Sequence, residues 1–225
     1  MIIALNLKAY NNSLGKNCLK YLRAAEKIAK EYRNEATIIF IPNISDLSLA
    51  KLNSKYVKIF SPVVSNIEEE GAYTGKVTFE NLKFLKVDGL LLNHSENRIE
   101  FELLKELVEK AKKYNLETLV CAKDLDEAKK ILKLKPTYLA YEDPLLIGSG
   151  IAISKAKASD VKKFAELVKN ESIPLCGAGI SNKEDVKMAL ELGTKGVLIA
   201  SAFVKAKSPT TFLREILKIT EKNQK

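Results

Sequence analysis

The feature that most constrains the fold is an alternation of two patterns along the whole chain. Short runs of β-branched, aromatic and leucine residues are followed by longer segments with apolar residues every third or fourth position, as at Cys18, Leu22 and Ala25. The first pattern is typical of buried strands and the second of amphipathic helices. The expected strands lie at Ile2–Asn6, Ala36–Ile41, Tyr56–Ser61, Gly89–Asn93, Glu117–Ala122, Thr137–Tyr141, Ile173–Cys176 and Gly196–Ala200.

Strands that alternate with helices form a parallel α/β sheet with helices packed outside it, because each parallel connection needs a crossover. Two arrangements are open: a doubly wound open sheet, usually of about five or six strands, and a closed (β/α)8 barrel. Eight uninterrupted units favour the barrel, although 225 residues lies toward its lower limit. No linker-like stretch divides the chain, so residues 1–225 are expected to form a single domain.

Three helix starts carry capping chemistry. Ser181 with Glu184, and Asp124 with Glu127, fit the capping-box spacing. Ser208-Pro209 places proline at a first helical position. We therefore expect helices to begin at these three places.

Composition narrows the class of protein. Hydrophobic residues make up 46% and charged residues 29% of the chain, an ordinary globular balance that argues against disorder. No apolar stretch approaches the ~20 residues that span a bilayer. The amino terminus lacks the basic region and cleavage signal of a secretory peptide. We expect a cytoplasmic protein without a membrane partner.

Charge and cysteine content bear on partners. The 37 Lys and Arg residues exceed the 28 Asp and Glu residues, and the net charge of +9 would suit an anionic partner. The lysines are interspersed with glutamates at helix-surface spacing and no nucleic-acid-binding motif accompanies them, so nucleic acid is not the expected partner. Cys18, Cys121 and Cys176 lack a CxxC pair or a histidine cluster, so we expect neither a disulfide framework nor a metal site.

The active site of a (β/α)8 barrel lies at the carboxyl ends of its strands, so the polar residues after each run are the candidates. Strand alternation places Asn6 and Lys8 on one side of the chain, toward the barrel interior. His94, the only histidine, follows the fourth run, and Glu142 follows the sixth. An inward lysine needs an anion, but Lys8 could equally swing out to solvent, and a lone histidine is more often structural than catalytic.

Loops with glycine or other small residues follow the last three runs. The loop Leu145–Gly150 is unusually apolar for a surface loop and is either a lid over the site or a packed loop. Cys176–Gly179 and Ala200–Ser201 are small enough for backbone N–H groups to approach an anion. Because phosphate sites in such barrels form after strands seven and eight, the whole set predicts a small phosphorylated substrate.

Together these segments resemble the triosephosphate isomerase family, whose fold is the (β/α)8, or TIM, barrel. The resemblance rests on Asn6-Leu-Lys8, Asn93-His-Ser-Glu96, Ala140-Tyr-Glu142 with Ile147-Gly-Ser-Gly150, and Cys176-Gly-Ala-Gly-Ile-Ser181, in family order over nearly the whole chain. The short length and the CGAGIS and SKAK segments resemble the archaeal branch. The resemblance implies interconversion of dihydroxyacetone phosphate and D-glyceraldehyde 3-phosphate through an enediolate, in glycolysis and gluconeogenesis, without metal or organic cofactor.

The resemblance also implies roles for single residues. Glu142 would move the proton, His94 would polarise the carbonyl, and Lys8 would neutralise substrate charge while pairing with Glu96. In this family a helix end keeps the histidine neutral, and Ser95 would cap such a helix behind His94. The implied substrate-binding residues are Asn6, Leu7, Lys8, Ile147, Gly148, Gly179, Ala200 and Ser201.

Two further matches concern a loop involved in assembly and a single cysteine. Gly71–Gly75 resembles the third loop of the family, and Thr74 at its tip would reach the neighbouring subunit near Asn6 and Lys8. This implies a homodimer or a homotetramer. Cys121 matches the family cysteine after the fifth strand.

The chain departs from the family directly after the base, where Asp143 stands in place of the usual proline and Pro144 follows. An ionised Asp143 beside Glu142 predicts a raised pKa for the base, unless Asp143 turns out to solvent.

Two other functions remain open: another phosphate-binding barrel enzyme, such as one of thiamine-phosphate or tryptophan synthesis, and a catalytically silent basic barrel that binds nucleic acid.

Overall fold

The computed structural model describes residues 1–146 and 152–221 and contains eight parallel strands that close into a barrel. The strands are β1 (Ile2–Asn6), β2 (Thr37–Ile41), β3 (Lys58–Ser61), β4 (Gly89–Leu92), β5 (Glu117–Ala122), β6 (Tyr138–Tyr141), β7 (Ile173–Cys176) and β8 (Gly196–Ile199). β1 pairs with both β2 and β8, which closes the ring. The expected (β/α)8 barrel is confirmed, and the open sheet is excluded.

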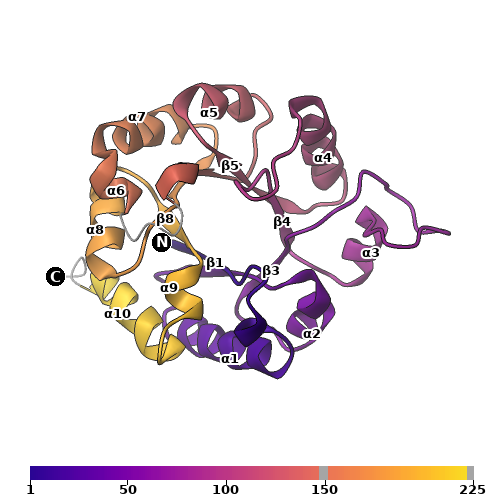
Figure 1. Ribbon diagram of the computed structural model, residues 1–225, viewed down its shortest axis with the longest axis horizontal. Helices are drawn as coiled ribbons and strands as arrows, with labels where there is room; N and C mark the ends of the chain where they lie inside the picture. Colours follow the sequence, from indigo (N-terminus) through magenta and orange to yellow (C-terminus); the bar gives the residue numbers. More distant parts are fainter. Residues whose placement is uncertain (147–151, 222–225) are drawn as a thin grey trace.

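Helices surround the barrel (Figure 1). Those of the described part of the chain are α1 (Lys16–Glu31), α2 (Leu47–Leu52), α3 (Phe79–Phe84), α4 (Phe101–Lys113), α5 (Leu125–Leu132), α6 (Ile153–Ala156), α7 (Ala158–Val168), α8 (Lys183–Glu191), α9 (Ser201–Val204) and α10 (Pro209–Glu221). α6 and α9 are four-residue helices that follow β6 and β8. They lie at the end of the barrel where the candidate site residues are found.

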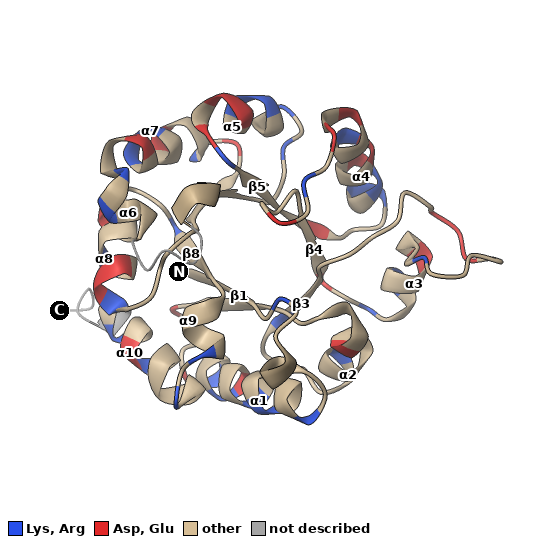
Figure 2. Cartoon of the chain, in the orientation of Figure 1, with Lys and Arg blue, Asp and Glu red and all other residues tan. Residues whose placement is uncertain are grey.

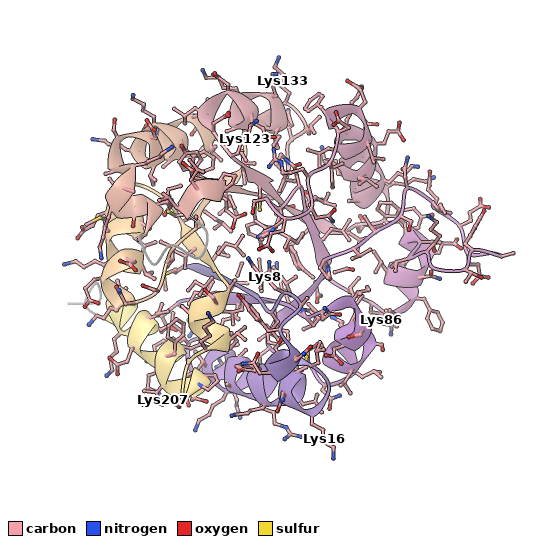
Figure 3. All side chains as sticks on the ribbon, viewed as in Figure 1. Lys8, Lys16, Lys86, Lys123, Lys133 and Lys207 are labelled. Atoms are coloured by element: carbon pink, nitrogen blue, oxygen red, sulfur yellow. The ribbon has the colours of Figure 1, made fainter. Side chains whose placement is uncertain are left out.

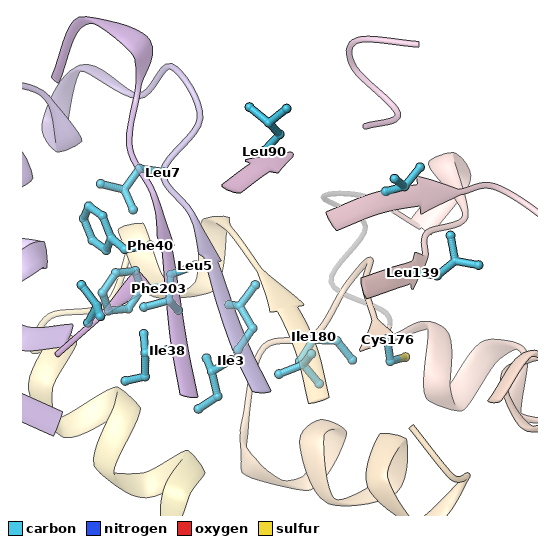
Figure 4. Close-up of a cluster of buried hydrophobic side chains, with 14 of the residues drawn as sticks. Ile3, Leu5, Leu7, Ile38, Phe40, Leu90, Leu139, Cys176, Ile180 and Phe203 are labelled. Atoms are coloured by element: carbon cyan, nitrogen blue, oxygen red, sulfur yellow. The ribbon is translucent and has the colours of Figure 1, made fainter. Parts of the chain in front are cut away.

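Strand alternation divides the apolar core into two layers. On β1, Ala4 faces an inner cluster inside the barrel, whereas Ile3 and Leu5 face an outer cluster beneath the helices. Figure 4 shows the outer cluster, in which Leu5 lies beside Phe203 of α9 and Leu7 lies beside Phe40 of β2. Because both faces of each strand are buried, the strands read as nearly continuous apolar runs in the sequence.

The helix caps agree with the sequence at two of three positions. The Asp124 side chain accepts from the backbone N–H of Glu127 at the start of α5, and α10 begins at Pro209. α8 is capped instead by Asn182, one residue after the expected Ser181. The Ser181 hydroxyl donates to the Asp185 carboxylate at 2.9 Å, so Ser181 contacts the first turn of α8 without capping it.

The segment between β3 and α3 projects from the ring of helices (Figure 1). Thr74 is exposed near its tip, where Gly75 has a φ of 75°.

Of the helices described, none is long and apolar enough to cross a membrane. Lys and Arg alternate with Asp and Glu on α4, α5, α7 and α8 (Figure 2).

Candidate active site

Lys8 reaches the barrel interior through a turn. β1 ends at Asn6, and Lys8 has a left-handed backbone with a φ of 51°. The Asn6 side chain fixes this turn, because its Oδ1 accepts the backbone N–H of Lys8 at 3.0 Å. Lys8 Nζ donates to Glu96 Oε1 at 2.8 Å. Figure 3 shows Lys8 within the ring, whereas Lys16, Lys133 and Lys207 lie at its periphery. Continued strand alternation was therefore the wrong reason for the inward lysine, although its location is as expected.

His94 is held in one orientation by the turn that follows β4. Asn93 is left-handed, with a φ of 56°, and its side-chain amide donates to the Cys121 carbonyl oxygen at 2.9 Å. The backbone N–H of Glu96 donates to His94 Nδ1 at 3.2 Å. A neutral imidazole whose Nδ1 accepts a hydrogen bond carries its proton on Nε2. His94 therefore presents an Nε2–H donor to the cavity.

The expected helix behind His94 is not formed. Residues 95–97 make a turn, in which the Asn97 N–H donates to the His94 carbonyl oxygen at 2.8 Å, and α4 begins only at Phe101. Ser95 Oγ is buried and has no hydrogen-bond partner among the described residues. The contact that fixes the His94 tautomer is thus one backbone N–H of a turn.

Glu142 directly follows β6 and is 5% exposed. Its Oε2 lies 3.4 Å from His94 Nε2 and accepts no hydrogen bond from the described residues. Its backbone N–H donates to the Ala122 carbonyl oxygen at 2.9 Å, which extends the β5–β6 ladder by one residue. The carboxylate therefore faces the imidazole with one oxygen available to accept a proton.

The electrostatics of Glu142 favour its ionised form. Burial raises the pKa of Glu142, but the imidazole of His94, the thiol of Cys121 and the ammonium of Lys8 together lower it below its ordinary value. Burial and the Glu142 charge hold the pKa of the Cys121 thiol well above its usual range, so Cys121 stays protonated beside the carboxylate. The Glu142 carboxylate is thus ionised at neutral pH.

Asp143 does not act on Glu142 as expected. Its carboxylate forms an ion pair with Lys157 and accepts the backbone N–H of Leu145 at 2.9 Å. Burial raises the pKa of Asp143, but these partners lower it below the ordinary value. The prediction of a raised pKa for Glu142 is wrong, because Asp143 turns neither toward the base nor out to solvent and is 5% exposed.

A cavity of about 130 Å³ opens at this end of the barrel. Of the candidate residues it is lined by Asn6, Lys8, His94, Glu142, Gly179, Ala200 and Ser201. Leu7 does not line it: the side chain is fully buried in the outer cluster, so any contact with a substrate would come from the backbone. Ile147 and Gly148 lie outside the described residues, as does most of the expected lid.

Residues of the loops after β7 and β8 also line this cavity. Ala178 and Gly179 are consecutive left-handed residues, with φ values of 61° and 70°. Ala200 directly precedes the short helix α9, which begins at Ser201. Residues of both loops line the same cavity as His94 and Lys8, and it is after these two strands that a barrel of this kind binds phosphate.

Comparison with known proteins decides the family. The family model for triosephosphate isomerase matches residues 1–220. The chain belongs to the triosephosphate isomerase family. It is 39% identical to the triosephosphate isomerase of Methanocaldococcus jannaschii, over 97% of this chain and 99% of that relative. It is 40% identical to the one of Pyrobaculum calidifontis, over 96% and 95% of the two chains. The expected isomerase family and archaeal likeness are confirmed.

Two features of this isomerase site were missed in the sequence. An added Cβ at Gly177 would lie 2.5 Å from Glu142 Cγ, so this glycine makes room for the base. Asp185 is 1% exposed, accepts from the N–H and hydroxyl of Ser181, and pairs with Lys155 of α6 at 2.6 Å. Gly177 lies within a motif whose glycines were interpreted only as an anion-binding loop. Asp185 gives no distinct signal in the sequence, because an acidic residue in the first turn of a helix is common.

Proposed function

We propose that this member of the family interconverts dihydroxyacetone phosphate and D-glyceraldehyde 3-phosphate, with Glu142 as the base. The observation that carries the proposal is the pairing of a buried, ionised carboxylate with an N–H donor: Glu142 Oε2 lies 3.4 Å from His94 Nε2 at one wall of the cavity. Abstracting a proton beside a carbonyl needs these two groups on the same substrate.

The reaction follows from the positions of these groups. Glu142 takes a proton from the carbon next to the carbonyl. The electron pair of that C–H bond forms a carbon–carbon double bond, and the π pair of the carbonyl moves to its oxygen. The His94 Nε2–H donates to this developing enediolate oxygen. His94 Nε2 then passes its proton to the former carbonyl oxygen and takes up the proton of the neighbouring hydroxyl, whose oxygen becomes the new carbonyl. Glu142 returns its proton to the former carbonyl carbon, so no atom is gained or lost. Neither a metal nor an organic cofactor is needed in this scheme.

Lys8 supplies the positive charge at the reacting end. Its Nζ is held by Glu96 Oε1 at 2.8 Å, and its side chain is 14% exposed. A partly buried ammonium stabilises the negative charge that develops on the substrate more strongly than an exposed one does. Asn6 holds the Lys8 turn, and Gly179, Ala200 and Ser201 would bind the phosphate through backbone N–H groups.

The test is a coupled isomerase assay on the purified protein with triose phosphates. Glu142→Gln keeps the shape of the side chain and removes its basicity, so turnover should fall by ~10²–10⁴-fold. His94→Gln keeps a donor and should lose less. No turnover by the unmodified chain would favour another phosphate-binding barrel enzyme, and a loss below about tenfold in Glu142→Gln would remove Glu142 from the mechanism.

Three broader expectations are part of the proposal. The exposed segment with Thr74 supports a homodimer or homotetramer, in which this loop contacts the partner near the site. Lys and Glu are mixed on the outer helices and do not form one basic surface. This supports a small anionic substrate, and not nucleic acid, as the binding partner of a chain with a net charge of +9. We place the protein in the cytoplasm as a single domain over residues 1–225.

A further inference from the structure

The backbone that carries Glu142 is held differently on its two sides. On the amino-terminal side the β5–β6 ladder fixes it through the bond from the Glu142 N–H to the Ala122 carbonyl oxygen, 2.9 Å long. On the carboxyl-terminal side the ladder ends, and the next residue is Asp143. The carboxylate of Asp143 is 7% exposed and is the first anchor of the chain after the base.

Both carboxylate oxygens of Asp143 are occupied. Oδ1 accepts the backbone N–H of Leu145 at 2.9 Å, which closes a tight turn over Pro144. Oδ2 forms an ion pair with Lys157 Nζ. Burying a carboxylate without a cation costs free energy. The observed conformation of the segment after Glu142 is therefore favoured only when Lys157 can pair with Asp143.

Lys157 is itself well placed to act as an anchor. It lies at the junction of α6 and α7, where its N–H donates to the Ile153 carbonyl oxygen at 2.8 Å and its carbonyl accepts from Val161 at 3.0 Å. α6 is tied in turn to the loop after β7, because the Ile153 N–H donates to the Ala178 carbonyl oxygen at 3.2 Å. Lys157 therefore joins the base segment to the phosphate side of the cavity.

We propose that Asp143 and Lys157 are positioning residues of the isomerase, whose ion pair fixes the backbone after Glu142 and thereby the place of the base. This inference rests on the proposed role of Glu142. Asp143 does not line the cavity, and its side chain does not contact the Glu142 side chain. It therefore acts on Glu142 through the peptide bond that the two residues share. Asp143 occupies the position where the family usually has a proline. Its ion pair with Lys157 therefore restrains the backbone here, as the fixed φ angle of proline would.

The test compares Lys157→Met, Lys157→Arg, Asp143→Asn and the double variant Asp143→Asn/Lys157→Met. Lys157→Met should lower kcat by about tenfold and leave KM for dihydroxyacetone phosphate within about twofold, because it displaces the base and spares the phosphate loops. Lys157→Arg keeps the charge and should restore kcat. The double variant should lose no more than Lys157→Met, since both changes break the same pair. The matched control is Lys169→Met, which breaks an exposed pair with Glu166 on the same helical segment and should leave kcat unchanged.

Hydrogen exchange gives a readout that does not depend on turnover. In Lys157→Met the amides of Glu142, Asp143, Leu145 and Leu146 should exchange faster than in the unmodified chain, whereas Lys157→Arg and Lys169→Met should not change them. Unchanged exchange in Lys157→Met would overturn the inference, whether or not the chain has the proposed activity. Additive losses of kcat in the double variant, or equal changes in kcat and KM, would also overturn it. Lack of isomerase activity in the unmodified chain would refute the proposed function alone.

Discussion

One methyl group added at Gly177 tests how closely the site fits its base. A Cβ there would lie 2.5 Å from Glu142 Cγ and 3.2 Å from both Cδ and Oε1. Carbon atoms pack at about 3.5–4.0 Å, so the Glu142 side chain must retreat by about 1 Å. Because a misplacement of about 1 Å costs on the order of 10²-fold in rate, Gly177→Ala should lower kcat by about two orders of magnitude, or about 2.7 kcal/mol of activation free energy.

The assay measures kcat and KM for dihydroxyacetone phosphate in the coupled reaction. We expect the loss in kcat, because the new methyl group touches the base and not the phosphate loops at Ala200 and Ser201. A kcat within about threefold of the unmodified enzyme would refute the reasoning, since the base would then tolerate displacement. A raised KM with unchanged kcat would refute it as well, by assigning Gly177 to binding.

A thermodynamic cycle isolates the contact itself. In the unmodified background, Gly177→Ala should lower the free energy of unfolding by about 1–3 kcal/mol, the usual cost of overpacking. In a Glu142→Ala background the Cγ that meets the new methyl group is gone, so the same change should cost much less. Equal costs in both backgrounds would show that the strain comes from backbone around 177 and not from the base.

Three other outcomes follow from the site. Lys8→Met removes a charge that lowers the pKa of Glu142, so the acidic limb of the kcat/KM profile should move to higher pH and KM should rise; an unmoved limb contradicts this. Thr74→Arg should give monomers of low activity in sedimentation velocity, and an intact oligomer would count against the loop contact. Burial raises the pKa of Asp185, but Lys155 and Ser181 lower it overall, so its stabilisation is complete above about pH 4 and is lost as the pH falls through the lowered value. Thermal melts should therefore show Asp185→Asn less sensitive to acid below about pH 4 than the unmodified chain, and parallel curves would disprove this.

The fold was predictable because its signal is repeated. Each strand is buried on both faces, so eight apolar runs stand out, and the structure moves their ends by only one or two residues, as at Tyr56, where β3 starts at Lys58. Periodicity does not resolve competition between neighbouring caps. Ser181 and Asn182 are both good capping residues, and Asn182 caps α8 because Asp185 engages the Ser181 side chain.

The site was predictable in its members and less so in its geometry. Glu142 directly follows β6 and His94 comes two residues after β4 ends, so the barrel brings both to one end. Lys8 comes two residues after β1 ends, where a left-handed turn and not strand alternation sets its direction. Asp143 could not be interpreted correctly, because its partner Lys157 is fourteen positions away, and only the packing of α6 brings it near. Tertiary partners of this kind leave no local pattern.

Charge balance explains how one lysine can serve this site. Among the described residues that line the cavity, Lys8 is the one cation, and Glu96 already offsets its charge. Under the proposed function, a substrate phosphate would be bound mainly by backbone N–H groups of the loops after β7 and β8, where small residues permit close approach. Lys8 is thereby left at the reacting end, where the enediolate charge develops near an ionised Glu142. Under the same proposal, the net charge of +9 would act at longer range and raise the local concentration of an anionic substrate, without adding a second cation to the cavity.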